Sequence, residues 1–314
     1  MVAGLCAAMP VNPVRAEPIT VSAVPVVLDP VDPSITRVGK LRYRGGLQLT
    51  SPDERFGGLS ALGLSADGKR MVAISDMGVR FAARPTYDAK GNLAGVTGWD
   101  LAPLTGPDGT ALRGKFFTDA EAMSPGVDGE IIVAFERDHR IWRYLAGDAV
   151  PRPIPRPVEL ANIIPNAGLE ALTLLDDGRL LAITEGLVLT GDSIGWVSDP
   201  AGWSVLTYAA DGGFRPTGAA TMPSGDVLVL ERYFSARGSL RTRIKRVEAA
   251  SVAPAARLQG TTLAEWGMTK TIDNFEGIEV ISGSRGETLI YIVSDDNFSN
   301  DQRTLLMMFE LDGG

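Results

Sequence analysis

The sequence predicts an all-β fold, a β-propeller of about five blades, and three observations lead to this prediction. A β-hairpin pattern recurs five times along the 314 residues. The 36 glycines and 20 prolines are spread over the whole chain, and long stretches of helical periodicity are hard to find. A strand-like run near the N-terminus can complete the last hairpin. Repetition of a β-unit at this period is typical of a propeller, in which each unit forms one blade.

The first expected element is the strand-like run 36–49 (TRVGKLRYRGGLQL). Five hairpins follow, and each has two runs rich in Val, Ile and Leu around a turn that contains glycine. They span residues 58–76, 120–136, 169–185, 216–231 and 275–295. A last run, TLLMMFEL, spans 304–311 and leaves the final blade short of one strand. We expect 36–49 to supply that strand, because closing the ring removes free sheet edges.

The hairpins begin about 50 residues apart, which is enough for four short strands in each blade. This spacing favours five blades. Six blades stay open as an alternative, because one copy can have diverged within the two longer intervals. The repeat leaves no stretch for an independent second core, so residues 17–314 are expected to form a single propeller domain.

The hairpin geometry places a set of carboxylates together. In an antiparallel hairpin the start of the first strand lies beside the end of the second, so acidic residues at both places share one mouth of the channel. These residues are Asp76, Glu121, Glu136, Glu170, Glu185, Glu231, Glu276 and Asp295. Like charges at such short range repel one another, so the mouth requires a cation or a set of arginines.

A metal site is one solution, because Ca²⁺ prefers oxygen ligands from carboxylates, amides and carbonyls. We therefore expect Ca²⁺ as the cofactor. The predicted metal ligands are Glu121, Glu170, Glu276, Asp295, Asp76 and Glu185. The alternative is a collar of arginines that pair with the carboxylates and leave no metal site.

Arginines near the mouth also suit an anionic partner, such as a small phosphate ester. The predicted substrate-binding residues are Arg137, Arg140, Arg232 and Arg215. His139 is the only histidine of the chain and follows a mouth carboxylate, so it is a candidate acid or base, with a polar loop residue as the alternative. The predicted catalytic residues are His139, Glu136 and Glu121. The Gly-x-Ser-x-Gly pattern at 191–195 is interpreted as a turn, because no helix follows it.

Charge and leader composition limit the function further. A net charge of −8 and a pI near 4.9 argue against nucleic-acid binding, which usually needs a basic face. Cys6 is the only cysteine, which excludes disulfides in a processed chain. Residues 1–16 are interpreted as a remnant of a secretory signal peptide, so a periplasmic or secreted location is expected. No later segment is long and apolar enough to span a bilayer.

The hairpins also contain short motifs that are fairly specific in combination. They are GGLSAL, DAEAM with FERDHRIWRY, GLEALT with ITEG, RPTGAA with LERYFS, and DNFEGIEV with IVSDDNFSNDQRTLL. Together they resemble the bacterial family called the esterase-like activity of phytase, or phytase-like domain proteins, over residues 40–312. This resemblance implies an exported β-propeller and suggests hydrolysis of phosphate or carboxylic esters.

These observations favour a hydrolase of that family, a Ca²⁺-assisted phosphoesterase that acts on anionic phosphorylated substrates at the channel mouth. A calcium-dependent lactonase or carboxylesterase is one alternative. A periplasmic ligand-binding or scaffold propeller without turnover is the other.

Overall fold

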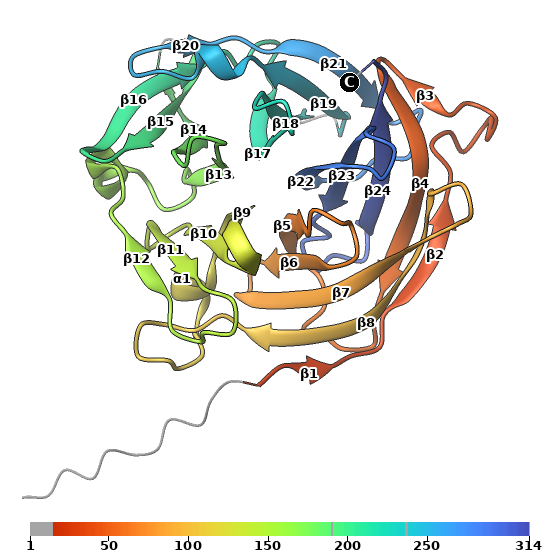
Figure 1. The fold of residues 1–314 in the computed structure, drawn as a ribbon, viewed down its shortest axis with the longest axis horizontal. Coiled ribbons are helices and arrows are strands. Elements are labelled where there is room, and N and C mark those ends of the chain that lie inside the picture. Colours follow the sequence, from red (N-terminus) through yellow and green to blue (C-terminus); the bar gives the residue numbers. More distant parts are fainter. Residues whose placement is uncertain (1–14, 190, 236–237, 314) are drawn as a thin grey trace, which may run out of the picture.

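The computed structural model describes residues 15–189, 191–235 and 238–313, and their strands form five sheets arranged as blades around a central axis (Figure 1). The all-β, five-bladed prediction is confirmed, and the six-bladed alternative is wrong for the described residues. The proposed signal segment falls almost entirely within residues 1–14, which lie outside the described part of the chain. No helix among the described residues is long and apolar enough to cross a membrane.

The first three blades follow one another along the chain, and their strands run from the channel outward in this order. The first blade contains β5 (Leu59–Leu64), β6 (Met71–Ser75), β7 (Val79–Tyr87), β8 (Leu93–Pro103) and β1 (Glu17–Pro18). The second contains β9 (Ala120–Pro125), β10 (Ile131–Phe135), β11 (Arg140–Tyr144) and β12 (Arg152–Ile154). The third contains β13 (Leu169–Leu174), β14 (Leu180–Leu189), β15 (Asp192–Asp199), β16 (Gly202–Tyr208) and β20 (Arg257–Leu258).

The remaining blades complete the ring. The fourth contains β17 (Arg215–Thr221), β18 (Val227–Phe234), β19 (Leu240–Val247) and β21 (Thr261–Gly267). The fifth contains β22 (Phe275–Ser282), β23 (Thr288–Ser294), β24 (Thr304–Leu311), β4 (Leu41–Thr50) and β2 (Ser22–Val26), and β3 (Arg37–Val38) also pairs with β4. Helical turns are short: α1 (Lys115–Thr118), η1 (Val127–Gly129), η2 (Val158–Asn162) and η3 (Ala249–Ser251).

Ring closure occurs in the fifth blade, as the sequence predicts. Strand β4 pairs antiparallel with β24, from Leu49 opposite Thr304 to Leu41 opposite Leu311. The strand lies at 41–50, so the first residues of the predicted run 36–49 form the separate short strand β3. The C-terminal strand is thereby enclosed between two neighbours, which leaves it no free edge.

The hairpin turns explain why glycine recurs in every copy. Gly68, Gly129, Gly178, Gly225 and Gly286 follow the first strand of each hairpin, with φ of 67°, 83°, 84°, 86° and 81°. An L-residue with a side chain is strained in this left-handed region, whereas glycine is not. The repeat therefore depends on glycine at these five turns.

The core consists of five apolar clusters, one between each pair of neighbouring blades. Inner strands read as continuous apolar runs because each packs between two blades. All six residues of β5 and all five of β10 are buried. Burial on both faces explains why these strands lack the apolar–polar alternation of a half-exposed sheet.

One carboxyl group lies inside this core, away from the mouth. Glu279 of β22 is 7% exposed and accepts a hydrogen bond from the backbone amide of Val280. Burial raises the pKa of Glu279 to about 8. The neutral form is therefore preferred in the folded state at physiological pH.

Replacement of Glu279 by Gln is expected to stabilise the protein at pH 8. The pKa of Glu279 is higher in the folded protein than in the unfolded chain. The contribution of the carboxyl group to the free energy of unfolding is therefore most favourable below the unfolded pKa near 4.3, and it is lost as the pH rises towards 8. We expect Glu279→Gln to gain about 1–3 kcal/mol over the parent at pH 8 and little at pH 5. Urea unfolding at both pH values, with exposed Glu248→Gln as the control, measures this. An equal difference at both pH values would contradict it.

Candidate functional site

A β-bulge near the start of every inner strand directs one side chain to the mouth. In each inner hairpin the pairing skips one residue close to the beginning of the first strand. The skipped residues are Ser60, Glu121, Glu170, Thr217 and Glu276. A bulged residue is free of the ladder and can turn its side chain away from the sheet. The three glutamates predicted to converge therefore occupy equivalent positions in three blades.

The second strand of each hairpin contributes the residue that follows the partner of the residue just before the bulge. In the second blade Ala120 pairs with Phe135, so Glu136 takes this place. The corresponding residues of the five blades are Asp76, Glu136, Glu185, Arg232 and Asp295. Four blades thus present a carboxylate, and the fourth blade presents a guanidinium.

The prediction that Glu231 belongs to the mouth is wrong, because the register of the fourth blade differs by one residue from the predicted alignment. Glu231 pairs with Pro216, so the next residue, Arg232, takes the mouth position. The Glu231 side chain is fully buried, accepts a hydrogen bond from the Tyr208 hydroxyl at 2.9 Å and pairs with Arg243. A one-residue shift moves a side chain to the opposite face of a strand.

These positions line a pocket of about 570 Å³ at the channel mouth. Its acidic residues are Asp76, Asp119, Glu121, Glu136, Glu170, Glu185, Glu276 and Asp295, and its basic residues are Lys115, Arg137 and Arg232. All six predicted metal ligands are among them. Eight carboxyl groups against three cationic groups give a formal excess of five negative charges.

The three basic side chains are already paired with pocket carboxylates. Lys115 contacts Asp76 at 2.6 Å and also pairs with Asp119. Arg137 pairs with Asp119 at 2.5 Å. The arginine collar left open by the sequence is therefore partly present.

Arg232 makes the widest set of contacts among these bases. It reaches Glu185 of the third blade at 3.0 Å and Glu276 of the fifth blade at 2.8 Å. It also donates a hydrogen bond to the side-chain oxygen of Asn274. One guanidinium thus connects three blades across the pocket.

Four pocket carboxyl groups have no ion pair with Lys or Arg within the described residues: Glu121, Glu136, Glu170 and Asp295. Burial, and then the neighbouring Glu170, raise the pKa of Glu121 well above its usual value. Burial, and then Glu185, do the same to the pKa of Glu170. Burial, and then Glu276, raise the pKa of Asp295 to about 8. The pocket therefore holds protons near neutral pH unless a cation replaces them.

Two pairs of carboxyl groups lie close together at the pocket wall. Glu170 lies near Glu136, whose Oε1 accepts a hydrogen bond from the amide of Gly168 at 2.5 Å. Glu121 lies near Asp119. Carboxyl groups so close together cannot all ionise without a counter-charge.

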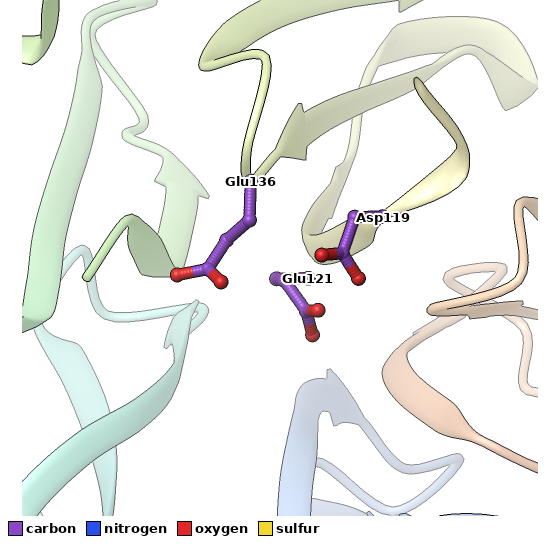
Figure 2. A group of neighbouring side chains, drawn as sticks. All are labelled: Asp119, Glu121 and Glu136. Atoms are coloured by element: carbon purple, nitrogen blue, oxygen red, sulfur yellow. The ribbon is translucent and has the colours of Figure 1, made fainter. Parts of the chain in front are cut away.

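Three pocket carboxyl groups lie close enough together to hold a metal ion, and the oxygens of one of them, Asp119, also pair with Lys115 and Arg137. Asp119, Glu121 and Glu136 each offer an oxygen within 4.8 Å of the others, and Figure 2 shows the three side chains arranged around a common space in the second blade. The pocket also contains the amide side chains of Asn274 and Asn297. An all-oxygen donor set with excess negative charge suits a hard divalent cation such as Ca²⁺.

Three predicted site residues lie outside the pocket lining. His139 is buried behind Glu136, with Nε2 3.3 Å from the carbonyl oxygen of Ile164. Arg140 stacks over the rings of Phe135 and Trp142, 3.8 Å and 4.4 Å from their centroids. Arg215 is the first residue of β17 and pairs through its backbone with Arg232. The structure brings the predicted Arg137 and Arg232 into the pocket, but not these three.

Sequence analysis missed two charged pocket residues, Asp119 and Lys115. Both come from the connection that enters the second blade, where α1 ends just before β9. Their spacing is a usable signal, because a Lys four residues before an Asp on a helical turn can form an ion pair, as these two residues do.

A second, much smaller space lies among the inner strands. The space beneath the bulged residues measures about 10 Å³. It is lined by Ser60, Ala61, Ala122, Met123, Glu170, Leu172, Gly218, Ala219, Glu276, Gly277 and Ile278. A cavity of this size holds one water molecule at most.

Solved structures similar to this chain include three enzymes or assigned enzymes at low identity. A PQQ-bound aldose sugar dehydrogenase from Streptomyces coelicolor has 13% identity, covers 93% of this chain and 99% of its own, and has a TM-score of 0.45. A protein assigned as a gluconolactonase has 12% identity, coverages of 94% and 92%, and a TM-score of 0.45. A luciferin-regenerating enzyme has 13% identity, coverages of 91% and 95%, and a TM-score of 0.41.

Sequence comparison identifies the family. No curated protein matches the chain. The model of the family described as "Phytase-like: Esterase-like activity of phytase" matches residues 54–298, a range that contains all five inner hairpins from β5 to β23. Since this match covers far more than half of the 314 residues, the chain belongs to the phytase-like family.

Proposed function

We propose that this protein is a Ca²⁺-assisted phosphoesterase that hydrolyses a small anionic substrate in the mouth pocket. The observation that carries the proposal is the charge imbalance: eight carboxyl groups face three basic side chains in one pocket. Excess buried negative charge of this kind is stabilised by a divalent cation, and an anionic substrate then binds to that cation. Membership of the phytase-like family supports ester hydrolysis as the reaction class.

Asp119, Glu121 and Glu136 would hold the cation, with Glu170, Glu276 and Asp295 nearby. When bound, Ca²⁺ supplies a positive charge that polarises the phosphoryl oxygens. Arg137 and Arg232 then provide N–H donors to the substrate from two sides of the pocket. Their existing ion pairs keep both guanidinium groups in place, so they need not be ordered on binding.

The hydrolysis requires two proton movements. A P–O bond forms to the oxygen of water and the P–O bond to the alcohol breaks, while water loses one proton and the alcohol oxygen gains one. Glu136 is held by the Gly168 amide and would serve as a cation ligand, so another carboxylate must accept the proton from water. Glu170 lines the same pocket without an ion pair, and it would take this proton and pass it to the alcohol oxygen.

The direct test is titration of Ca²⁺ into chelator-treated protein, followed by assays with an aryl phosphate, an aryl acetate and a sugar lactone. Calcium binding with calcium-dependent phosphate release is the expected result. Preference for the lactone or acetate would instead identify a lactonase or carboxylesterase. Calcium or ligand binding without turnover of any ester would identify a binding propeller. We further propose a periplasmic or secreted location, on the composition of residues 1–16.

A further inference from the structure

An exposed aromatic side chain lines the acidic pocket, and other exposed aromatic residues belong to chain segments that contribute to its lining. Within the described residues, the exposed aromatic side chains are Phe116, Phe117, Phe234 and Phe298. Phe234 lines the pocket itself, as does the half-buried Leu240. The rings of Phe116 and Phe117 contact each other edge to face, with centroids 5.1 Å apart. Exposed aromatic groups that gather at one opening mark a surface that binds apolar groups.

Two of the remaining phenylalanines are next to pocket residues in the chain. Phe116 directly follows Lys115, and Phe298 directly follows Asn297, and both of these neighbours line the pocket. Phe234 belongs to the fourth blade, whereas α1 precedes the second. Phe234 and Leu240 therefore give the pocket an apolar wall in the fourth blade.

The charge count limits how many phosphate groups the pocket can take. All three basic side chains are engaged by carboxylates, and the formal excess is five negative charges. Two divalent cations would still leave one negative charge, so every phosphate group, which adds about −1.5 to −2 at pH 7, increases the repulsion. A compound with several phosphate groups is therefore disfavoured more strongly than a compound with one.

Building on the proposed function, we propose that the substrate is an ester of a single phosphate group with an apolar alkyl or aryl alcohol. The phosphate reaches the carboxylate-bound cation, and the apolar group packs against Phe234 and Leu240 at the pocket wall. Polyphosphorylated polar compounds, such as inositol hexakisphosphate, are rejected by the acidic lining. Phe234 and Leu240 thus select for an apolar alcohol, and the pocket carboxyl groups limit the substrate to one phosphate group.

The test uses non-hydrolysable phosphonates, so that binding is measured without turnover. Methyl-, butyl- and octylphosphonate, the last below its micelle concentration, are titrated calorimetrically into the calcium-loaded protein. Affinity should rise with chain length, by up to about fourfold for each methylene that is buried. Phe234→Ala should weaken octylphosphonate by about tenfold and leave methylphosphonate unchanged. Met268→Ala is the control, because Met268 and Phe234 are both 69% exposed and Met268 lies outside the pocket lining.

The outcomes separate this inference from the phosphoesterase proposal. Equal affinities for methyl- and octylphosphonate, or tighter binding of inositol hexakisphosphate than of octylphosphonate, would overturn the inference even if aryl phosphates are hydrolysed. Chain-length-dependent binding that Phe234→Ala removes would support it even if no ester is hydrolysed, in which case the phosphoesterase proposal alone fails. Binding of dispersed octylphosphonate and binding of phosphatidic acid vesicles would each support the proposed substrate class. Tighter binding of the dispersed compound would indicate a soluble substrate, and tighter binding of the vesicles would indicate a membrane lipid.

Discussion

Replacement of Glu121 by Gln is expected to lower calcium affinity by about 10- to 100-fold and calcium-dependent turnover with it. Glu121 belongs to the three-carboxylate group that can hold a cation and has no ion pair among the described side chains. The amide keeps the size of the carboxyl group but removes the charge that attracts the metal. Calorimetric titration of Ca²⁺ and assay of aryl phosphate hydrolysis in the same buffer measure both effects.

Two controls make the Glu121 result specific. Glu248→Gln removes the same charge at an exposed position outside the pocket and should leave calcium binding unchanged. Burial already raises the pKa of Glu121, so the chelator-treated Glu121→Gln variant should be at least as stable as the parent. A variant that binds calcium like the parent would disprove the metal role of Glu121, whatever its activity.

Replacement of Arg232 by Met is expected to destabilise the metal-free protein by about 3 kcal/mol at pH 8. The guanidinium is the common partner of Glu185 and Glu276, and its removal leaves both carboxylates without an opposite charge. The Arg232 side chain is only 22% exposed, so this ion pair is largely buried. Removing one partner of a buried ion pair costs more stability than the intact pair contributes, because the other charge is left buried and unpaired. Urea unfolding in the presence of chelator measures the loss.

The loss should depend on pH with a defined sign. Burial raises the pKa of Glu276, and Arg232 opposes that rise, so removing the arginine raises this pKa further. A carboxyl group whose pKa is raised by folding makes its most favourable contribution to the free energy of unfolding below its unfolded pKa near 4.3. That contribution is lost as the pH rises through the folded pKa. Arg232→Met should therefore approach the parent at pH 5. Added calcium should restore part of the stability at pH 8, and equal losses at pH 5 and pH 8 would refute the explanation.

Local periodicity accounts for what the sequence could predict. A hairpin places the ends of its two strands together, so Glu121, Glu170 and Glu276 could be assigned to one mouth from their positions alone. Ring closure by residues near 41–50 was predictable for a similar reason, because the final blade lacks a strand. Both predictions need only the repeat and the geometry of antiparallel pairing.

The parts that failed depend on information outside one hairpin. The choice between Glu231 and Arg232 rests on the register of the fourth blade, which a carboxylate pattern alone does not fix. Arg140 was expected at the substrate, but it is two residues from Trp142 on β11, so both side chains lie on one face and stack. Asp119 enters from the connection between blades, whose path the repeat does not determine.

The narrow space beneath the bulged residues limits the passage of solutes along the propeller axis. At about 10 Å³ it holds no more than one water molecule, so it offers a solute no route along the propeller axis. A molecule that enters the mouth cannot leave through this space. Entering and leaving molecules therefore share the mouth, and a small anion that stays bound in the pocket blocks the next molecule from binding.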